Sequence, residues 1–186
     1  MKYQQTIRLK DGRECVLRSG TAEDGQAVLD NFILTHTQTD NLVSYPDEIT
    51  MTAEGEGKFM QDKADSPDEM EILAEVGGKL VALAGFGRVS PRDKMKHRAE
   101  FGISVDRAFW GLGIGRAMTR VCIDAAKKAG YAQLELEVVA DNRAAIALYE
   151  SEGFTEYGRN PLGFRSRTAG WQELVLMRLV LSAETR

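Results

Sequence analysis

The sequence predicts a mixed α/β fold in which antiparallel hairpins come first and strands alternate with helices later. Two turn dipeptides, Asp11-Gly12 and Gly77-Gly78, each separate two apolar runs, a pattern typical of hairpins. From residue 100 onward, strand-like apolar runs alternate with segments of helical periodicity that end at a glycine. The chain has 186 residues, and we expect residues 1–186 to form one domain.

The first half of the chain combines two hairpins with two helices. Thr21 has the character of a helix cap, with acidic residues directly after it. Gly55 and Gly57 weaken the second helix. The predicted elements are strands at 6–9 and 14–18, a helix from Thr21, a helix over 50–65, and strands at 71–76 and 79–86.

The second half alternates strand and helix. The first of its helices carries lysines in the last turn, and Gly130 follows as a C-terminal signal. Gly153 closes the second helix in the same way. The predicted elements are strands at 100–105, 134–139, 154–158 and 173–181, and helices over 113–128 and 142–152.

Composition excludes several classes of function. A net charge of -4 argues against a nucleic-acid-binding protein, which usually has a basic excess. Cys15 and Cys122 lie in apolar surroundings and are expected as buried thiols, and His36 and His97 have no partners at metal-ligand spacing. The most apolar stretch, residues 174–181, is far shorter than the roughly 20 residues of a membrane helix. We therefore expect a cytoplasmic protein without metal, nucleic acid or membrane as a partner.

A glycine-rich turn carries the first chemical signal. The strand ending at Val105 leads into Gly111-Leu112-Gly113-Ile114-Gly115, which opens a helix and so presents unpaired backbone N–H groups to phosphate. Arg116 in the first turn would add a charged donor. A turn with glycines for packing alone is the alternative. A dinucleotide loop would need glycine at Arg116, and a nucleotide-triphosphate loop would need Lys-Ser or Lys-Thr after the glycines.

Two motifs resemble those of the GNAT N-acetyltransferases. Residues 110–116, Trp-Gly-Leu-Gly-Ile-Gly-Arg, resemble the pyrophosphate loop of that family, Gln/Arg-x-x-Gly-x-Gly/Ala, although Trp110 stands where Gln or Arg is usual. Residues 142–154 resemble the family pattern Asn-x-x-Ala-x-x-Leu-Tyr-x-x-x-Gly-Phe. The resemblance covers roughly residues 99–155.

The resemblance implies a fold, a donor and a binding site. The GNAT fold has a central, mostly antiparallel sheet of six to seven strands with a splayed parallel pair, flanked by about four helices. Acetyl-CoA is the implied acyl-donor cosubstrate, attacked directly by an amine in a ternary complex, and a homodimer is a common arrangement. The implied cofactor-binding residues are Ile103, Ser104, Val105, Gly111, Leu112, Gly113, Ile114, Gly115, Arg116, Asn142 and Tyr149.

The resemblance also implies catalytic residues. Tyr149 is the usual general acid for the departing CoA thiolate, and its alternative role is a core tyrosine. Glu100 and Glu137 are the candidate general bases for the acceptor ammonium, with Glu135 as a third. Asn142 caps its helix in either interpretation.

The acceptor is the least defined part of the prediction. Added sequence at residues 40–65 and 160–170 favours a small-molecule amine. A protein N-terminus, as in the ribosomal-protein acetyltransferases, and a non-catalytic acyl-CoA sensor are the alternatives. Ten acids between Asp47 and Glu75 would attract a cationic amine or simply form a solvated face. Basic residues over 88–98 are candidates for CoA phosphates, and Phe164 and Trp171 for the acceptor pocket.

Overall fold

One eight-stranded sheet organises the computed structural model, which describes residues 1–181. Six to seven strands were predicted, and the number is larger because β2 pairs with β3 and so joins the first hairpin to the central sheet. Across the sheet the order is β1 (Gln4–Arg8), β2 (Glu14–Ser19), β3 (Met70–Val76), β4 (Lys79–Arg88), β5 (Arg98–Val105), β6 (Gln133–Val139), β8 (Gly170–Val180) and β7 (Thr155–Ser166).

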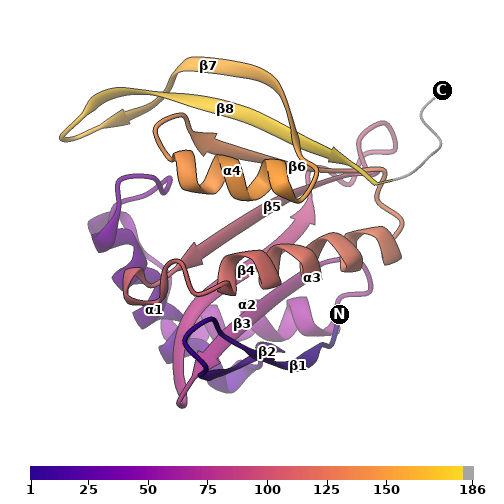
Figure 1. The fold of residues 1–186 in the computed structure, drawn as a ribbon. Coiled ribbons are helices and arrows are strands. Elements are labelled where there is room, and N and C mark those ends of the chain that lie inside the picture. Colours follow the sequence, from indigo (N-terminus) through magenta and orange to yellow (C-terminus); the bar gives the residue numbers. More distant parts are fainter. Residues whose placement is uncertain (182–186) are drawn as a thin grey trace.

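Helices cover both faces of this sheet (Figure 1). On one face lie α1 (Gly25–Gln38) and α2 (Ala53–Asp65), whose Val28 and Met60 pack with Leu73 and Leu83. On the other lie α3 (Ile114–Lys128) and α4 (Arg143–Ser151), which close the larger core. Because side chains alternate along a strand, neighbouring residues of β3 and β4 serve the two cores in turn.

Within residues 1–181, β5 has no strand neighbour on the β6 side beyond its first three residues. The two strands are parallel and pair only at Arg98–Gln133, Ala99–Leu134 and Glu100–Glu135. From there β5 continues along β4 as far as Val105, while β6 continues along β8. We call residues 101–105 the unpaired edge of β5. It confirms the predicted splayed parallel pair.

Helix α4 begins and ends at the residues that the capping signals in the sequence predict. The Asn142 Oδ1 atom accepts a hydrogen bond from the Ala145 amide at 3.3 Å and so begins α4. Gly153, with φ of 94°, ends it. In α3 the buried face includes Met118 and Cys122, and two lysines occupy the last turn.

β7 is longer than the predicted segment 154–158 and continues to Ser166. The polar stretch around Pro161 hid this continuation in the sequence. Proline is tolerated there because β7 is an edge strand, and the pairing with β8 is irregular between Asn160 and Phe164.

Two predictions from composition can be compared with this fold. Cys15 and Cys122 are both free and buried, as expected. Within residues 1–181, no helix has the length and apolar character needed to cross a bilayer.

Candidate active site

The glycine-rich turn between β5 and α3 is open to solvent. Gly111 and Gly113 have φ values of 76° and 99°, in the left-handed region that favours glycine. A Cβ atom at either position would meet no atom within 4 Å. The Trp110 side chain lies beside the turn, because its indole Nε1 donates to the Val105 carbonyl at 2.7 Å. Among the described residues, no side chain therefore occupies the space over Gly111 or Gly113.

The backbone amides of this turn are unpaired. The Ala117 amide donates to the Gly113 carbonyl at 3.1 Å, the first hydrogen bond of α3. In the part of the chain that the structure describes, the amides of residues 111–116 donate to no backbone or side-chain acceptor. Free N–H groups and the positive end of the helix dipole together favour an anion.

The Arg116 side chain points to α4. Its guanidinium lies 3.0 Å from the Ser151 Oγ atom and 3.1 Å from the Glu152 carboxylate. Arg120 binds the same carboxylate at 2.8 Å. The Arg116 guanidinium is thus engaged with α4, whereas its backbone amide has no partner among the described residues. A phosphate contact by the guanidinium stays a prediction.

Tyr149 is buried next to the unpaired edge of β5. Its ring centroid lies 6.2 Å from that of Phe101 and 5.8 Å from that of Phe154, and only 8% of the residue is exposed. Its hydroxyl forms no hydrogen bond with any residue in 1–181. Burial raises the pKa of Tyr149 to about 12, so the hydroxyl keeps its proton at neutral pH and is available as a donor.

A cavity of about 600 Å³ lies between the sheet and the two helices α1 and α2. Its floor contains glycines on neighbouring strands, where a side chain would otherwise fill the space. Gly85 of β4 pairs with Gly102 of β5, and Gly87 pairs with Glu100. The cavity thus reaches from α2 to the start of the unpaired edge, where Ile103 and Ser104 also line it.

The cavity combines apolar walls with carboxylates that have no cationic partner. Phe32 and Phe59 contribute to the walls. Glu56, Glu71 and Glu100 line it, and none of them forms an ion pair within residues 1–181. Burial raises the pKa of Glu56, and it raises the pKa of Glu71 to about 8. A cationic guest would favour the ionised forms of these carboxylates.

The Acetyltransferase (GNAT) family model matches residues 34–154. The chain belongs to the GNAT acetyltransferase family. This confirms the predicted family, its fold and its class of enzyme.

A curated relative is similar over part of the chain. The [Ribosomal protein bS18]-alanine N-acetyltransferase of Escherichia coli K12 is 44% identical over 84 residues, which are 44% of this chain and 55% of the relative. The chain therefore spans about half the length of that curated relative.

Solved GNAT structures agree over nearly the whole fold. An acetyltransferase from Streptococcus pneumoniae has a TM-score of 0.84 at 22% identity, with 90% of this chain and 99% of that one covered. A putative acetyltransferase from Salmonella typhimurium, solved with acetyl-CoA, has a TM-score of 0.81 at 21% identity, with 92% and 96% covered.

The candidate bases of this GNAT domain have three different environments. Glu100 is exposed and lines the cavity. Glu137 is exposed on β6 opposite Leu176 and is not part of the cavity lining. Glu135 is bound by Arg98 at 2.6 Å, and the same ion pair lowers its pKa although burial opposes this. Glu135 is therefore structural, while roles for Glu100 and Glu137 stay predictions.

Glu56 and Glu71 are cavity residues that the sequence prediction did not single out. The signal was present for Glu71. Strand alternation places it on the same face as Leu73, which packs under α1 and α2. Most other acids of residues 47–75 are engaged elsewhere, as in the pair between Glu69 and Lys63 at 2.6 Å.

The tip of the β7–β8 hairpin holds the segment between α1 and α2. Arg167 binds Asp47 at 2.7 Å and lies 4.0 Å from the Tyr45 ring centroid. The Tyr45 hydroxyl in turn donates to Asp40 at 3.0 Å. We call these contacts the hairpin-tip contact. Since Leu42 and Val43 of the same segment line the cavity, the contact fixes the cavity rim.

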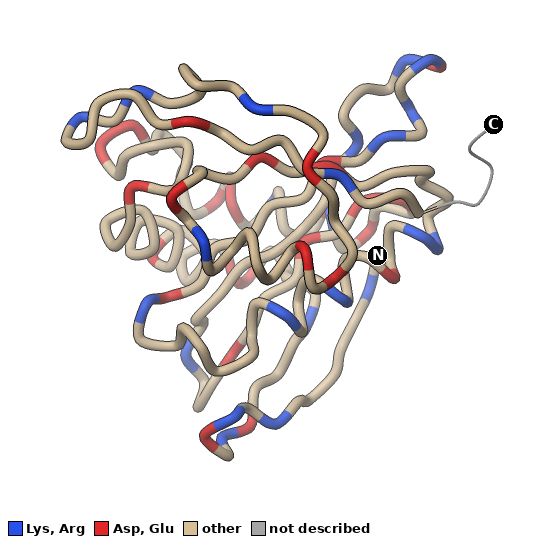
Figure 2. The backbone as a smooth tube through the Cα atoms, turned by 45° about the horizontal axis from the view of Figure 1, so that its top comes forward, with Lys and Arg blue, Asp and Glu red and all other residues tan. Residues whose placement is uncertain are grey.

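Two further predictions concerned residues outside this GNAT site. Trp171 is 58% exposed and lies next to Arg165, and neither Trp171 nor Phe164 lines the cavity. Of the basic residues of 88–98, Arg88 ends β4 and lines the cavity and Arg98 begins β5, while Arg92, Lys94 and Lys96 lie on the loop that projects between these two strands (Figure 2). The glycine-rich turn follows the opposite end of β5, so this loop is not placed to meet phosphates bound there.

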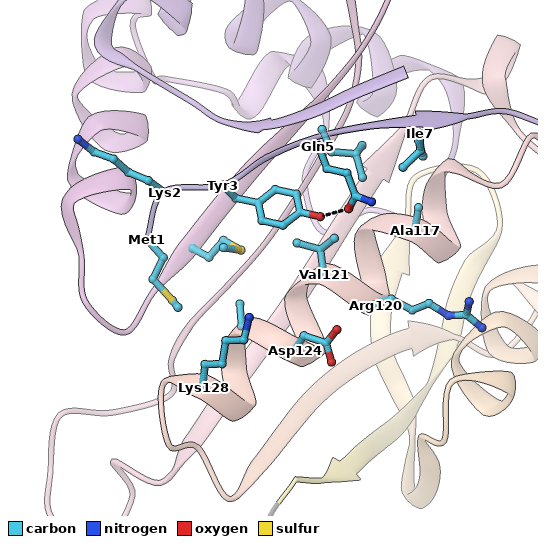
Figure 3. Close-up of a pocket in the computed structure, with 13 residues that line it drawn as sticks. Met1, Lys2, Tyr3, Gln5, Ile7, Ala117, Arg120, Val121, Asp124 and Lys128 are labelled. Atoms are coloured by element: carbon cyan, nitrogen blue, oxygen red, sulfur yellow. Dashed lines mark hydrogen bonds between the residues drawn. The ribbon is translucent and has the colours of Figure 1, made fainter. Parts of the chain in front are cut away.

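A second cavity of about 420 Å³ lies between β1 and α3 (Figure 3). Tyr3, whose hydroxyl donates to Gln5, lies on one side, and Val121 and Asp124 of α3 lie on the other. None of the predicted site residues lines it. It is therefore separate from the candidate active site.

Proposed function

We propose that this protein is an N-acetyltransferase that takes its acetyl group from acetyl-CoA and transfers it to the α-amine of a protein N-terminus. Family membership supports the reaction. The E. coli relative, named for the alanine of ribosomal protein bS18, favours a protein acceptor over the small-molecule amine that the sequence had favoured. The observation that carries the proposal is the run of unpaired amides over residues 111–116 beside the unpaired edge of β5.

In this proposal the donor lies along the unpaired edge. The free amides of residues 111–116 bind the diphosphate. The amides of the pantetheine arm pair with Ile103, Ser104 and Val105 as an added strand would, with Asn142 as a further contact. The sulfur then ends beside Tyr149, and a backbone N–H of β5 polarises the thioester carbonyl.

The reaction proceeds by direct attack. The acceptor ammonium first loses a proton, because only a neutral amine is a nucleophile. The nitrogen attacks the thioester carbon, the carbonyl oxygen becomes an oxyanion, and the C–S bond breaks. Tyr149 donates its proton to the departing thiolate. Of the two candidate bases Glu100 and Glu137, Glu100 lines the cavity that leads to the thioester and Glu137 does not.

The cavity is suited to a cationic amine. Glu56, Glu71 and Glu100 line it without an ion-pair partner among the described residues, and a cationic amine beside them would favour their ionised forms. Phe32 and Phe59 offer apolar surface to a side chain that follows the amine. An N-terminal residue with a free ammonium and a small apolar side chain fits this chemistry.

Two measurements test the proposal. Calorimetric titration should show that acetyl-CoA binds, and mass spectrometry should show acetylation of an alanine-initiated peptide. The same peptide with a blocked N-terminus and an internal lysine, together with a polyamine, serves as the comparison. Absence of acetyl-CoA binding at high micromolar concentration would exclude the donor assignment. Binding without turnover on any amine would favour a sensor, and preference for the polyamine would favour the small-molecule alternative.

A further inference from the structure

The carboxylate of Glu71 lies over the central strand of the sheet. Glu71 of β3 pairs with Gly85 of β4, and Gly85 pairs with Gly102 of β5. Because Gly85 has no side chain, the Glu71 carboxylate occupies the space above it. A Cβ atom built at Gly85 would lie only 1.9 Å from the Glu71 Oε2 atom.

This position is close to the unpaired edge of β5. Neighbouring strands are about 4.8 Å apart, so the carboxylate above β4 is roughly one strand spacing from Gly102. Gly102 belongs to the unpaired edge and lies two residues after Glu100, the last residue of β5 that pairs with β6. A Cβ atom built there would meet no atom within 4 Å, so the space above it is open. An acceptor nitrogen that approaches a thioester on this edge would pass beside Glu71.

Glu71 has no hydrogen-bond or ion-pair partner in the described part of the chain. On the same strand and face, Glu75 is bound by Arg18. Glu56, only 8% exposed, also lines the cavity without a partner within residues 1–181. The titratable and charged groups that face Glu71 or lie behind it are His36 of α1, Glu56 and Lys63 of α2, Arg88 of β4, Glu100 of β5 and, across the sheet, Cys122 of α3.

The two cations in this set are already engaged. Lys63 binds Glu69 at 2.6 Å, and Arg88 binds Asp68. Neither therefore neutralises the cavity carboxylates fully. The acceptor ammonium would be the cation that meets Glu71.

We propose that Glu71 receives the proton that the acceptor ammonium loses before it attacks the acetyl thioester, an inference that rests on the proposed function. An N–H bond of the ammonium breaks and an O–H bond forms on the Glu71 carboxylate, which leaves a neutral amine and a neutral carboxylic acid. The nitrogen then forms the C–N bond and the C–S bond breaks. The nitrogen loses its second proton, which replaces the proton that Tyr149 gives to the CoA thiolate. The proton on Glu71 returns to solvent through the cavity.

The acid strength of Glu71 agrees with this role. Burial raises its pKa to about 8, and a neighbouring ammonium favours the ionised form. The pKa of a protein α-amine is about 7.7–8.0, so the proton moves between groups of similar strength. A lysine side chain, with a pKa of about 10.4, would lose its proton to Glu71 far less readily. Glu71 therefore favours an α-amine over a lysine side chain.

The test uses Glu71→Gln in the full chain, with Glu75→Gln as a control from the same strand and face. With an alanine-initiated peptide, Glu71→Gln should lower kcat about 100-fold or more, as expected when a general base is lost. An aminooxy-terminated peptide is already neutral at pH 7 and needs no base. With that acceptor, Glu71→Gln should retain kcat within about threefold of wild type. Glu75→Gln should retain kcat with both acceptors, and Glu71→Gln should bind acetyl-CoA as wild type does.

Several results would overturn the inference. One is a Glu71→Gln variant that turns over the alanine peptide like wild type. Another is an equal fall in kcat with both peptides, which would assign Glu71 to folding. A third is a rise in KM with kcat unchanged, which would assign Glu71 to acceptor binding. Urea unfolding and the affinity for acetyl-CoA identify a variant that fails to fold, and Glu71→Asp, which keeps the carboxylate, should then recover part of the rate. A wild-type protein that acetylates no amine would overturn the proposed function as well.

Discussion

Replacement of Tyr149 by phenylalanine separates catalysis from folding. The substitution removes one hydroxyl from a side chain packed between Phe101 and Phe154. That hydroxyl has no hydrogen-bond partner within residues 1–181, and the ring itself stays in place. The role of Tyr149 as proton donor can thus be tested with little change in packing.

The expected effects on catalysis and on stability differ in size. Loss of a general acid should lower kcat about 100-fold, which corresponds to about 2.7 kcal/mol of transition-state stabilisation. The free energy of unfolding should stay within about 1 kcal/mol of wild type, because the hydroxyl has no hydrogen-bond partner among the described residues to lose.

The assay is CoA release, followed with a thiol reagent at saturating acetyl-CoA and peptide, together with urea unfolding. Tyr131→Phe is the matched control. Tyr131 is also buried, packs edge-on against Phe86 at 5.9 Å and has an unpaired hydroxyl within the described residues. Its replacement should leave kcat unchanged. A Tyr149→Phe variant with kcat within about threefold of wild type would show that the thiolate leaves without this proton.

Three further predictions follow from the geometry. Gly113→Ala should lower the free energy of unfolding by about 1–2 kcal/mol and weaken acetyl-CoA binding. Gly12→Ala, at a hairpin turn with a similar φ of 89°, should lower the free energy of unfolding by the same amount and leave acetyl-CoA binding intact. Urea unfolding and calorimetric titration measure the two quantities for both variants. Between pH 5 and 8 the free energy of unfolding should fall by up to about 1.4 kcal/mol per pH unit, because folding raises the pKa of Glu71 and the folded state therefore binds its proton more tightly than the unfolded state does. This stabilisation is complete below the unfolded pKa near 4 and is lost as the pH rises to about 8. Glu71→Gln should flatten the dependence, and an unchanged slope would contradict the prediction. Arg167→Ala should raise the KM for the acceptor several-fold and leave kcat and acetyl-CoA affinity unchanged, because it breaks the hairpin-tip contact at the cavity rim. An unchanged KM in steady-state kinetics would contradict this prediction.

Much of the fold could be predicted because its signals are local. The Asp11-Gly12 and Gly77-Gly78 turns, the Asn142 cap and the glycines after the helices each specify a conformation within a few residues. The binding turn is equally local, since its glycines and the helix behind them are contiguous. The predicted segments therefore agree with most observed elements to within a few residues.

The acceptor side could not be predicted because it depends on distant pairings. Glu71 and Glu75 look alike in the sequence and share one face of β3, yet Arg18 binds one and the cavity surrounds the other. That difference depends on where α2 crosses the sheet and on the glycine opposite Glu71. Similarly, Arg167 contacts Asp47 across more than a hundred residues, beyond the range of any pattern in the chain.

The separation of β5 from β6 has a consequence for the stability of the fold. Strands β1–β5 and strands β6–β8 each pair with their neighbours within the group, but within residues 1–181 the pairing of β5 with β6 joins the two groups only at Arg98, Ala99 and Glu100. A donor that hydrogen-bonds to the free side of β5 would add the pairing that the protein lacks, so the coenzyme would act as a structural component as well as a reagent. Saturation at a hundred times Kd would raise the unfolding free energy by about 2.7 kcal/mol. The melting temperature should therefore report how much of the enzyme is charged with acetyl-CoA.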